Sequence, residues 1–342
     1  MNRRLLTALL AVILTFAAVG GAALVYEHSE TLRQSEWLKG LASENNSTSK
    51  YDETVELGGK TYGFDHRIET YLFLGTDASG NEDGEKEGKY HGKMADFLLL
   101  MVLDYTDDTY GCIQIDRNTV TKVDEPDFEG LAIATRDLQI CVSHWYGVNK
   151  EMSALNTVKS VRTLLGGLDR IDGYYVLNME DIRLMNHTVG GVEITFDEDL
   201  TEIDPAFEEG ETVRLSDEQA ERFVRSRMSV GEGTNEERMG RQKQYMDAFL
   251  AKVKSISSDD SEFADRLWQS LRSNATTDMI GNDFSRITQM FLSGEDKGIL
   301  QFEGEHTTGF ILGDGVEHEE FYPETQSIVD VMTKLFSLEP VE

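Results

Sequence analysis

The sequence has little cysteine and only 7 histidines, and these shortages exclude several classes of protein. Among 342 residues there are only 2 cysteines, Cys112 and Cys141, too few for a disulfide framework. In an exported protein the two could form one bridge, or they could remain two buried thiols. No CxxC or HExxH pattern occurs and no two histidines are spaced as zinc ligands, so no zinc site is indicated.

Positive charge is also scarce. The chain has 32 Lys and Arg against 63 Asp and Glu, a formal net charge of −31. Such acidity argues against nucleic acid as a partner and does not favour direct docking on an anionic membrane surface. No internal repeat is present, so the exported part is expected to form one large or two small domains.

One long apolar run lies near the N-terminus. Residues 5–26 carry no charge and have about the 20-residue length that spans a bilayer. Arg3 and Arg4 precede the run, which predicts a cytoplasmic tail of residues 1–4 and an extracytoplasmic location for the rest of the chain. Small residues at 20–23 leave a cleaved signal peptide as the alternative. We favour an uncleaved single-pass anchor in the cell membrane, because the run is long for a signal peptide.

A polar segment, residues 27–66, follows and is interpreted as a stalk. The folded body is expected to begin with an apolar strand over residues 68–74, which runs into Gly75-Thr76-Asp77. After a glycine-rich, charged loop, Asp96 opens the run FLLLMVL, whose continuous apolarity predicts a strand covered on both faces.

Asp77 and Asp96 therefore flank one loop, Asp77 at the end of one strand and Asp96 at the start of the next. Mg²⁺ usually takes one or two carboxylates from a protein and completes its octahedron with water and substrate phosphates, so the pair could hold Mg²⁺. The alternative is that each carboxylate caps a turn.

Further strands and helices alternate along the chain. Residues 112–116, 174–177 and 192–196 are predicted strands, and residues 156–165 and 182–188 have helical spacing. This alternation predicts an α/β fold with a parallel or mixed sheet.

Arginines gather between residues 222 and 242 in an otherwise acidic sequence. Guanidinium groups bind phosphate oxygens two at a time, so several arginines from two segments predict a phosphate or pyrophosphate site. Pairing with the glutamates of the same stretch is the alternative. Arg117, at the end of a predicted strand, could join a cluster formed by Arg222, Arg225, Arg227, Arg238 and Arg241.

Two capping boxes order this stretch. Ser216 with Gln219 starts a helix that must end near Arg225 if Arg225 and Arg227 are to bind one ligand. Thr234 with Glu237 starts a second helix, through about residue 253. One face of that helix is predicted to carry Arg238, Gln242, Tyr245 and Phe249.

These motifs resemble the LytR-CpsA-Psr family over residues 68–256, and the single N-terminal span fits the same pattern. The resemblance rests on the GTD at 75–77, Asp96 before its strand, the IDRN at 115–118, the VRSR at 224–227 and the RMGRQ at 238–242.

The resemblance implies a three-layer α/β/α sandwich with a mixed central sheet, formed by residues 67–256, with residues 257–342 as a C-terminal extension packed on it. It implies a Mg²⁺-dependent phosphotransferase that moves a glycan phosphate from a polyprenyl pyrophosphate-linked precursor to peptidoglycan or another envelope acceptor. Asp77 and Asp96 would be metal ligands. Catalytic roles would fall to Asp77, Asp96, Arg117, Arg227 and Arg238, and substrate binding to Lys93, Arg225, Arg241 and Gln242.

Three residues depart from the family pattern. Met94 replaces an arginine, and Asn118 and Asn235 replace aspartates. Lys93 could restore the lost charge, but without the guanidinium fork. The alternative is therefore a weakly active or non-catalytic protein that binds the lipid-linked glycan, or, third, a phosphatase that uses water. The double substitution Met94→Arg with Asn235→Asp is expected to raise transfer if the chain is a diminished catalyst.

Overall fold

The computed structural model describes most of the chain beyond residue 50. It covers residues 51–76, 92–126, 132–169, 171–226 and 233–341, together with the backbone of β4 (Glu85–Lys86) and β5 (Lys89–Tyr90). The predicted tail and membrane span, residues 1–26, lie outside the described residues, as do Asp77 and Arg227. In the part of the chain that is described, no helix is long and apolar enough to cross a bilayer.

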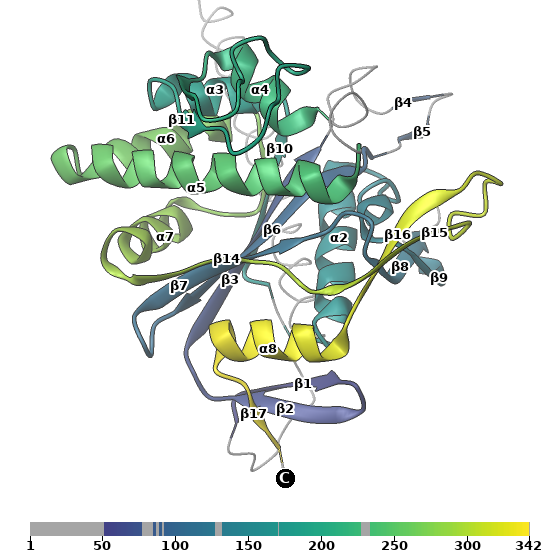
Figure 1. The fold of residues 1–342 in the computed structure, drawn as a ribbon. Coiled ribbons are helices and arrows are strands. Elements are labelled where there is room, and N and C mark those ends of the chain that lie inside the picture. The colour runs from purple at the N-terminus through teal and green to yellow at the C-terminus, as the bar shows by residue number, and fades with distance from the viewer. Residues whose placement is uncertain are drawn as a thin grey trace, which may run out of the picture. The chain divides into compact units, whose positions relative to one another are not determined.

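A six-stranded mixed sheet forms the centre of the structure (Figure 1). The pairs β10–β3 and β7–β14 are parallel, whereas β13–β10, β3–β6 and β6–β7 are antiparallel. The fold is thus α/β with a mixed central sheet, as predicted. The strands in spatial order are β13 (Thr276–Thr277), β10 (Gly173–Asn178), β3 (Ile68–Thr76), β6 (Ala95–Asp104), β7 (Thr109–Ile115) and β14 (Glu295–Leu300).

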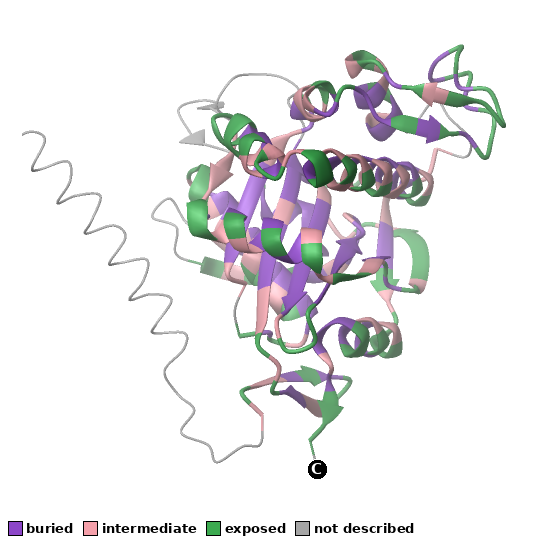
Figure 2. Ribbon diagram, turned by 90° about the vertical axis from the view of Figure 1, so that its left-hand side faces the viewer, coloured by how far each residue is buried: buried purple, intermediate pink, exposed green. Residues whose placement is uncertain are grey.

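Helices cover both faces of this sheet, and β6 shows why its sequence is continuously apolar. Leu98 and Leu100 pack on one side, with α2 (Lys150–Leu164) and α8 (Thr325–Phe336). Leu99 and Met101 pack on the other side, and Figure 2 shows the buried strands between the helical layers. The second layer consists of α3 (Asp181–Thr188), α4 (Asp217–Arg225), α5 (Asn235–Asp259), α6 (Phe263–Arg272) and α7 (Gly281–Ser293).

The two predicted capping sites start α4 and α5. Ser216 Oγ accepts from the Gln219 amide at 3.2 Å and Gln219 Oε1 accepts from the Ser216 amide at 3.0 Å, a complete capping box. Helix α4 ends at Arg225, as the sequence required. Thr234 Oγ1 accepts from the amide of Glu237 at 3.2 Å, and α5 continues beyond residue 253 to Asp259.

Part of the predicted stalk belongs to the folded body. β1 (Glu53–Leu57) and β2 (Lys60–Phe64) form a three-stranded sheet with β17 (Glu339–Pro340). Val55, Leu57 and Phe64 are buried because the sheet packs under α8, with the rings of Phe64 and Phe336 5.6 Å apart. Burial of these three apolar side chains explains why the folded part begins before residue 66.

The C-terminal segment is also more than an extension. Residues after 257 supply β13 and β14 of the central sheet, and α6, α7 and α8 on its two faces. The two core clusters, one on each face of the sheet, therefore contain residues from both segments.

Further hairpins lie outside the central sheet. β8 (Val120–Pro126) with β9 (Ala132–Gln139), followed by the 3₁₀ turn η2 (Ile140–Ser143), lies beside β15 (Gly304–Gly309) and β16 (His318–Pro323). The Phe321 amide joins them by donating to the Asn118 carbonyl at 3.0 Å. The predicted strand at 192–196 is β11 (Glu193–Thr195), which pairs with β12 (Thr212–Arg214) and not with the central sheet.

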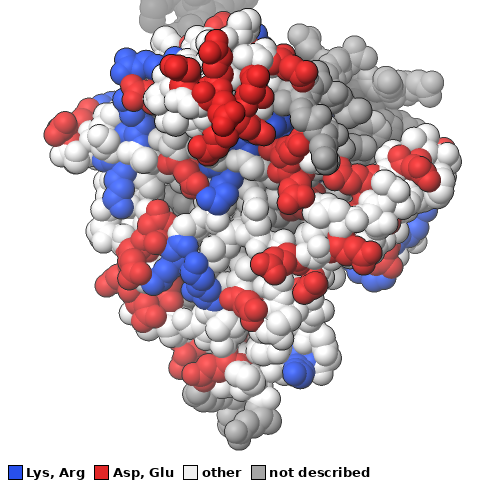
Figure 3. All heavy atoms as spheres, viewed as in Figure 1, with Lys and Arg blue, Asp and Glu red and all other residues white. Residues whose placement is uncertain are grey.

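Charge on the surface follows the composition. On the face seen in Figure 3, acidic side chains gather over α3, α4 and their loops, and Lys and Arg form only small groups between them. The view thus shows no extended basic surface of the kind that binds a phosphate backbone.

Candidate functional site

Three charged side chains converge at one end of the central sheet. The antiparallel register pairs Leu98 with Ile115, so Asp96 and Arg117 face each other two residues further on. Arg117 Nη1 lies 3.1 Å from Asp96 Oδ1, and Arg238 Nη1, from α5, lies 3.6 Å from the same oxygen. Their side chains are 16, 14 and 8% exposed for Asp96, Arg117 and Arg238. We call these three residues the arginine centre; one carboxylate there faces two guanidinium groups.

Arg117 keeps hydrogen-bonding capacity for a ligand. Its Nη2 contacts only sulfur atoms, Met94 Sδ at 3.1 Å and Cys141 Sγ at 3.3 Å, which are weak acceptors. Its buried Nε has no hydrogen-bond partner among the described residues. An oxyanion would satisfy these donors better than the sulfurs do.

Neither cysteine is bridged. Both are free and buried, and burial raises the pKa of the Cys141 thiol although the Arg117 guanidinium opposes the shift. Cys141 therefore stays a neutral thiol beside Arg117 and does not compete with Asp96 for its charge.

A hydrogen-bonded bridge links the arginine centre to a carboxylate that was not among the predicted site residues. Arg238 Nη2 donates to Asn235 Oδ1 at 2.6 Å, and Asn235 Nδ2 donates to Asp116 Oδ1 at 2.7 Å. The Asn118 amide also donates to that oxygen at 2.7 Å. Burial raises the pKa of Asp116, and the Asn118 amide partly offsets the rise. In the sequence, Asp116 was only the last residue of a predicted strand; its position next to Arg117 was the available signal.

Arg241 and Gln242 hold the end of α4. Arg241 Nε donates to the Phe223 carbonyl at 3.2 Å, its Nη2 donates to the Ser226 carbonyl, and Gln242 Nε2 donates to the Val224 carbonyl at 3.4 Å. The last carbonyl groups of a helix need such donors. These bonds account for the burial of Arg241, which was predicted to bind substrate, without a ligand.

Two further residues that were predicted to bind substrate, Arg225 and Lys93, have other contacts. Arg225 Nη1 donates to Glu221 Oε1 at 2.5 Å. The Lys93 carbonyl lies 2.6 Å from His144 Nδ1. Burial lowers the pKa of His144 to about 4, so a neutral ring holds the backbone beside Met94.

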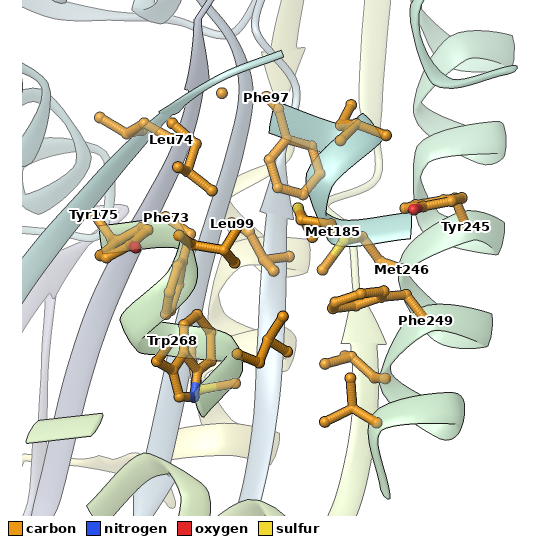
Figure 4. Close-up of a pocket in the computed structure, with 18 of the residues that line it drawn as sticks. Phe73, Leu74, Phe97, Leu99, Tyr175, Met185, Tyr245, Met246, Phe249 and Trp268 are labelled. Carbon is orange, nitrogen blue, oxygen red and sulfur yellow. The ribbon is translucent and has the colours of Figure 1, made fainter. Parts of the chain in front are cut away.

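An apolar cavity lies between the sheet and the second helical layer, and residues next to the arginine centre line it. Phe97, next to Asp96, and Gln242, one turn after Arg238, both line it. Its empty volume is about 1160 Å³, part of which is open to solvent. Figure 4 shows its aromatic and aliphatic walls, which include Phe73, Leu99, Tyr175, Met185, Phe249 and Trp268. The shape and lining suit a long hydrocarbon chain.

The described residues contain one of the two predicted metal ligands. Asp96 offers a partly exposed carboxylate at the arginine centre, and Asp77 lies outside them. One or two carboxylates suffice for Mg²⁺ when phosphate oxygens supply other ligands, so the donor set fits. Elsewhere His66, Asp104 and Asp107 group together, but Asp104 is already bonded to His66 Nδ1 at 2.7 Å and to the Thr106 amide at 2.8 Å.

Comparisons with known proteins agree with this geometry. Residues 38–336 match the LytR_cpsA_psr family. A protein of Bacillus cereus (strain AH820), polyisoprenyl-teichoic acid–peptidoglycan teichoic acid transferase TagU, is 24% identical over 269 residues, which cover 78% of this chain and 77% of that protein.

Solved structures share the fold. Protein gbs0355 from Streptococcus agalactiae superposes with a TM-score of 0.62 at 18% identity, over 81% of this chain and 90% of that one. TagT bound to LIIa-WTA superposes with a TM-score of 0.55 at 19% identity, over 78% of this chain and 91% of that one.

Proposed function

The chain belongs to the LytR_cpsA_psr family, and from this premise we propose that it is a phosphotransferase of the cell envelope. Its donor would be a glycan linked through pyrophosphate to a polyprenyl lipid. It would transfer the glycan phosphate to peptidoglycan or another envelope acceptor. The relative from Bacillus cereus, a teichoic acid transferase by name, supports this class of reaction.

One observation carries the proposal: the arginine centre lies next to residues that line the apolar cavity. Arg117 and Arg238 converge on one carboxylate, and the cavity walls begin at the neighbouring Phe97 and Gln242. A molecule with an anionic head and a long hydrocarbon tail satisfies both features at once, whereas a soluble phosphate would leave the cavity unused.

In this proposal the protein acts by positioning and by neutralising charge. The cavity would hold the lipid so that its pyrophosphate meets the donors of Arg117 and Arg238. An acceptor hydroxyl would attack the phosphorus next to the glycan, and polyprenyl phosphate would leave. Fixed guanidinium groups would stabilise the charge on the leaving oxygens.

Mg²⁺ is proposed as the cofactor, held by Asp96 and by Asp77. When bound, it would supply further positive charge to the pyrophosphate oxygens. Asp96 would then neutralise part of the charge of Arg117 and hold its guanidinium in position, as the 3.1 Å contact supports.

The proposal predicts cleavage of a defined donor. The full-length chain in detergent would be incubated with Mg²⁺, a polyprenyl pyrophosphate-linked oligosaccharide and peptidoglycan fragments. Mass spectrometry is expected to find polyprenyl phosphate and a glycan phosphate joined to the fragments, and chelation of the metal is expected to suppress both products. Binding of the donor with no cleavage under any of these conditions would contradict a transferase.

We also propose that residues 5–26 anchor the protein in the cell membrane with the N-terminus in the cytoplasm. The uncharged apolar run after Arg3 and Arg4 supports this topology. A reporter fused after residue 60 is expected to be active only outside the cytoplasm, and the mature protein is expected to keep its N-terminus. A processed chain that begins near residue 25 would instead show a signal peptide.

A binding or scaffold protein is the second candidate, and the substitutions Met94, Asn118 and Asn235 favour it. The contacts that these three residues make weaken the case for a binding or scaffold protein. Met94 and Asn235 contact the two arginines directly, and Asp116 supplies a buried carboxylate between Asn118 and Asn235. The arginine centre is therefore intact despite the changed residues.

A further inference from the structure

A second, smaller cavity lies nearer to the N-terminal end of α5 than the apolar one. It has an empty volume of about 360 Å³, part of it open to solvent. Met239 of α5 lines it, whereas Gln242, one turn further, lines the apolar cavity. Glu236 of α5 also lines the second cavity. The other walls come from β7 and the residue after it (Gln114, Asp116), from the segment after β14 (Gln301, Phe302) and from the β15–β16 hairpin (His306, Phe321).

Asp116 presents an unused oxygen to this cavity. The side chain is 4% exposed, and its two hydrogen bonds, from the Asn118 amide and from Asn235 Nδ2, both end on Oδ1. Within the described ranges, Oδ2 accepts no hydrogen bond. Oδ2 is not one of the fully buried atoms, so it stays accessible from the cavity, and a ligand that donates a hydrogen bond there can take the place of water.

The remaining residues that line the second cavity indicate which kind of ligand fits it. Glu236 stands exposed on α5, and Asp116 is itself acidic, so a phosphate or carboxylate would be repelled. The amides of Gln114 and Gln301 are joined to each other at 2.6 Å. His306 packs on the ring of Phe321 with ring centres 4.5 Å apart, which offers a flat surface beside a polar edge. Neutral hydroxyl donors with an apolar face, as in a sugar ring, match this lining.

Two hydrogen bonds connect this cavity to the arginine centre. Asp116 binds Asn235, and Asn235 binds Arg238, at 2.7 and 2.6 Å. The two cavities thus contact successive turns of α5 next to Arg238, one suited to a lipid and the other to a polyol.

We propose that the second cavity is the acceptor subsite, in which a sugar hydroxyl of the envelope glycan donates its hydrogen bond to Oδ2 of Asp116. This inference rests on the proposed phosphotransferase function. As the hydroxyl oxygen bonds to the phosphorus, its proton passes to Asp116 Oδ2. The bond from phosphorus to the bridging oxygen breaks, and polyprenyl phosphate leaves with the electron pair.

Two variants test the subsite. Asp116→Asn keeps an oxygen for the bonds from Asn118 and Asn235 but cannot take a proton. It is expected to lower kcat for transfer by about 10²-fold, the lower end of what a positioned general base contributes. His306→Ala removes one wall and is expected to raise KM for the acceptor about fivefold or more. His318→Ala is the matched control, since it alters a histidine of the same hairpin that pairs with Asp314 at 2.9 Å and does not line the cavity.

Acceptor binding is measured separately, with no donor present. A neutral disaccharide of N-acetylglucosamine and N-acetylmuramic acid, with its lactyl carboxyl group amidated, is titrated into the full-length protein, and NMR saturation transfer is recorded. Wild type and His318→Ala are expected to bind it, and Asp116→Asn and His306→Ala to bind it more weakly. Equal binding by all four proteins would overturn the inference, as would a wild type that does not bind. Weaker donor binding by Asp116→Asn would also overturn it, because Asp116 would then act only through Arg238. Disaccharide binding without donor cleavage in wild type would contradict the transferase and leave the subsite standing.

Discussion

Replacing Arg117 with alanine is expected to lower transfer by about 10² to 10³-fold, the cost of removing one preorganised donor from a transition-state site. The effect should be large because Arg117 is poorly satisfied without a ligand: two of its nitrogens face sulfur or no partner among the described residues. Arg238→Ala should have a similar effect. Donor affinity, measured by calorimetry with a non-cleavable analogue, is expected to fall in both.

The Arg117→Lys variant distinguishes the effect of the positive charge from the effect of the planar guanidinium group. Lysine keeps the charge but cannot bind two oxygens in one plane, so only part of the activity should return. Arg214→Ala is the matched control: Arg214 pairs with Glu193 on the β11–β12 hairpin and is 62% exposed. Full activity in both Arg117→Ala and Arg238→Ala would show that the arginine centre is structural.

Local rules predicted much of this structure. The Ser216 capping box and the requirement that α4 end near Arg225 follow from nearby residues, and both are found. The common face of Arg238, Gln242, Tyr245 and Phe249 follows from helix geometry, and all four are buried. Continuous apolarity identified β6 as a strand covered on both faces.

Contacts between distant residues could not be predicted in the same way. The hydrogen bond from Asn235 to Asp116 joins residues 119 positions apart, so nothing local marks Asp116 as part of the site. The pairing of β14 with β7 and of β17 with β2 depends on the whole fold. The sequence around Arg241 predicted that it binds a ligand. Its hydrogen bonds to carbonyl groups at the end of α4 depend on how α4 and α5 pack, which the sequence does not show.

The structure also changes what restoring a family residue should do. From the sequence, aspartate at position 235 was expected to raise transfer. The structure places Asn235 as a donor to Asp116 and an acceptor from Arg238, two roles that an amide fills together and an ionised carboxylate does not. Met94→Arg would similarly bring a second guanidinium against Arg117, which now contacts the Met94 sulfur.

Asn235→Asp alone is therefore expected to destabilise the protein by about 3 kcal/mol at neutral pH, because it replaces a hydrogen bond to a buried carboxylate with a second carboxylate at the same distance. Two carboxylates this close raise the pKa of one of them above its unfolded value of about 4. The loss of stability should then be absent below about pH 4, grow as the pH rises from there to the raised pKa, and remain constant above the raised pKa.

The exchanged pair, Asn235→Asp with Asp116→Asn, places the amide on β7 and the carboxylate on α5. The new amide would donate to the new carboxylate, and that carboxylate would still accept from Arg238, so stability and donor affinity should return towards wild type. Transfer should remain low, because the exchanged pair lacks the carboxylate that faces the acceptor subsite. Urea unfolding of the two single variants and the double variant at pH 5 and pH 8 measures the coupling. Additive losses in the double variant would show that Asn235 and Asp116 do not form the bridge, whereas recovered stability with recovered transfer would remove Asp116 from the reaction.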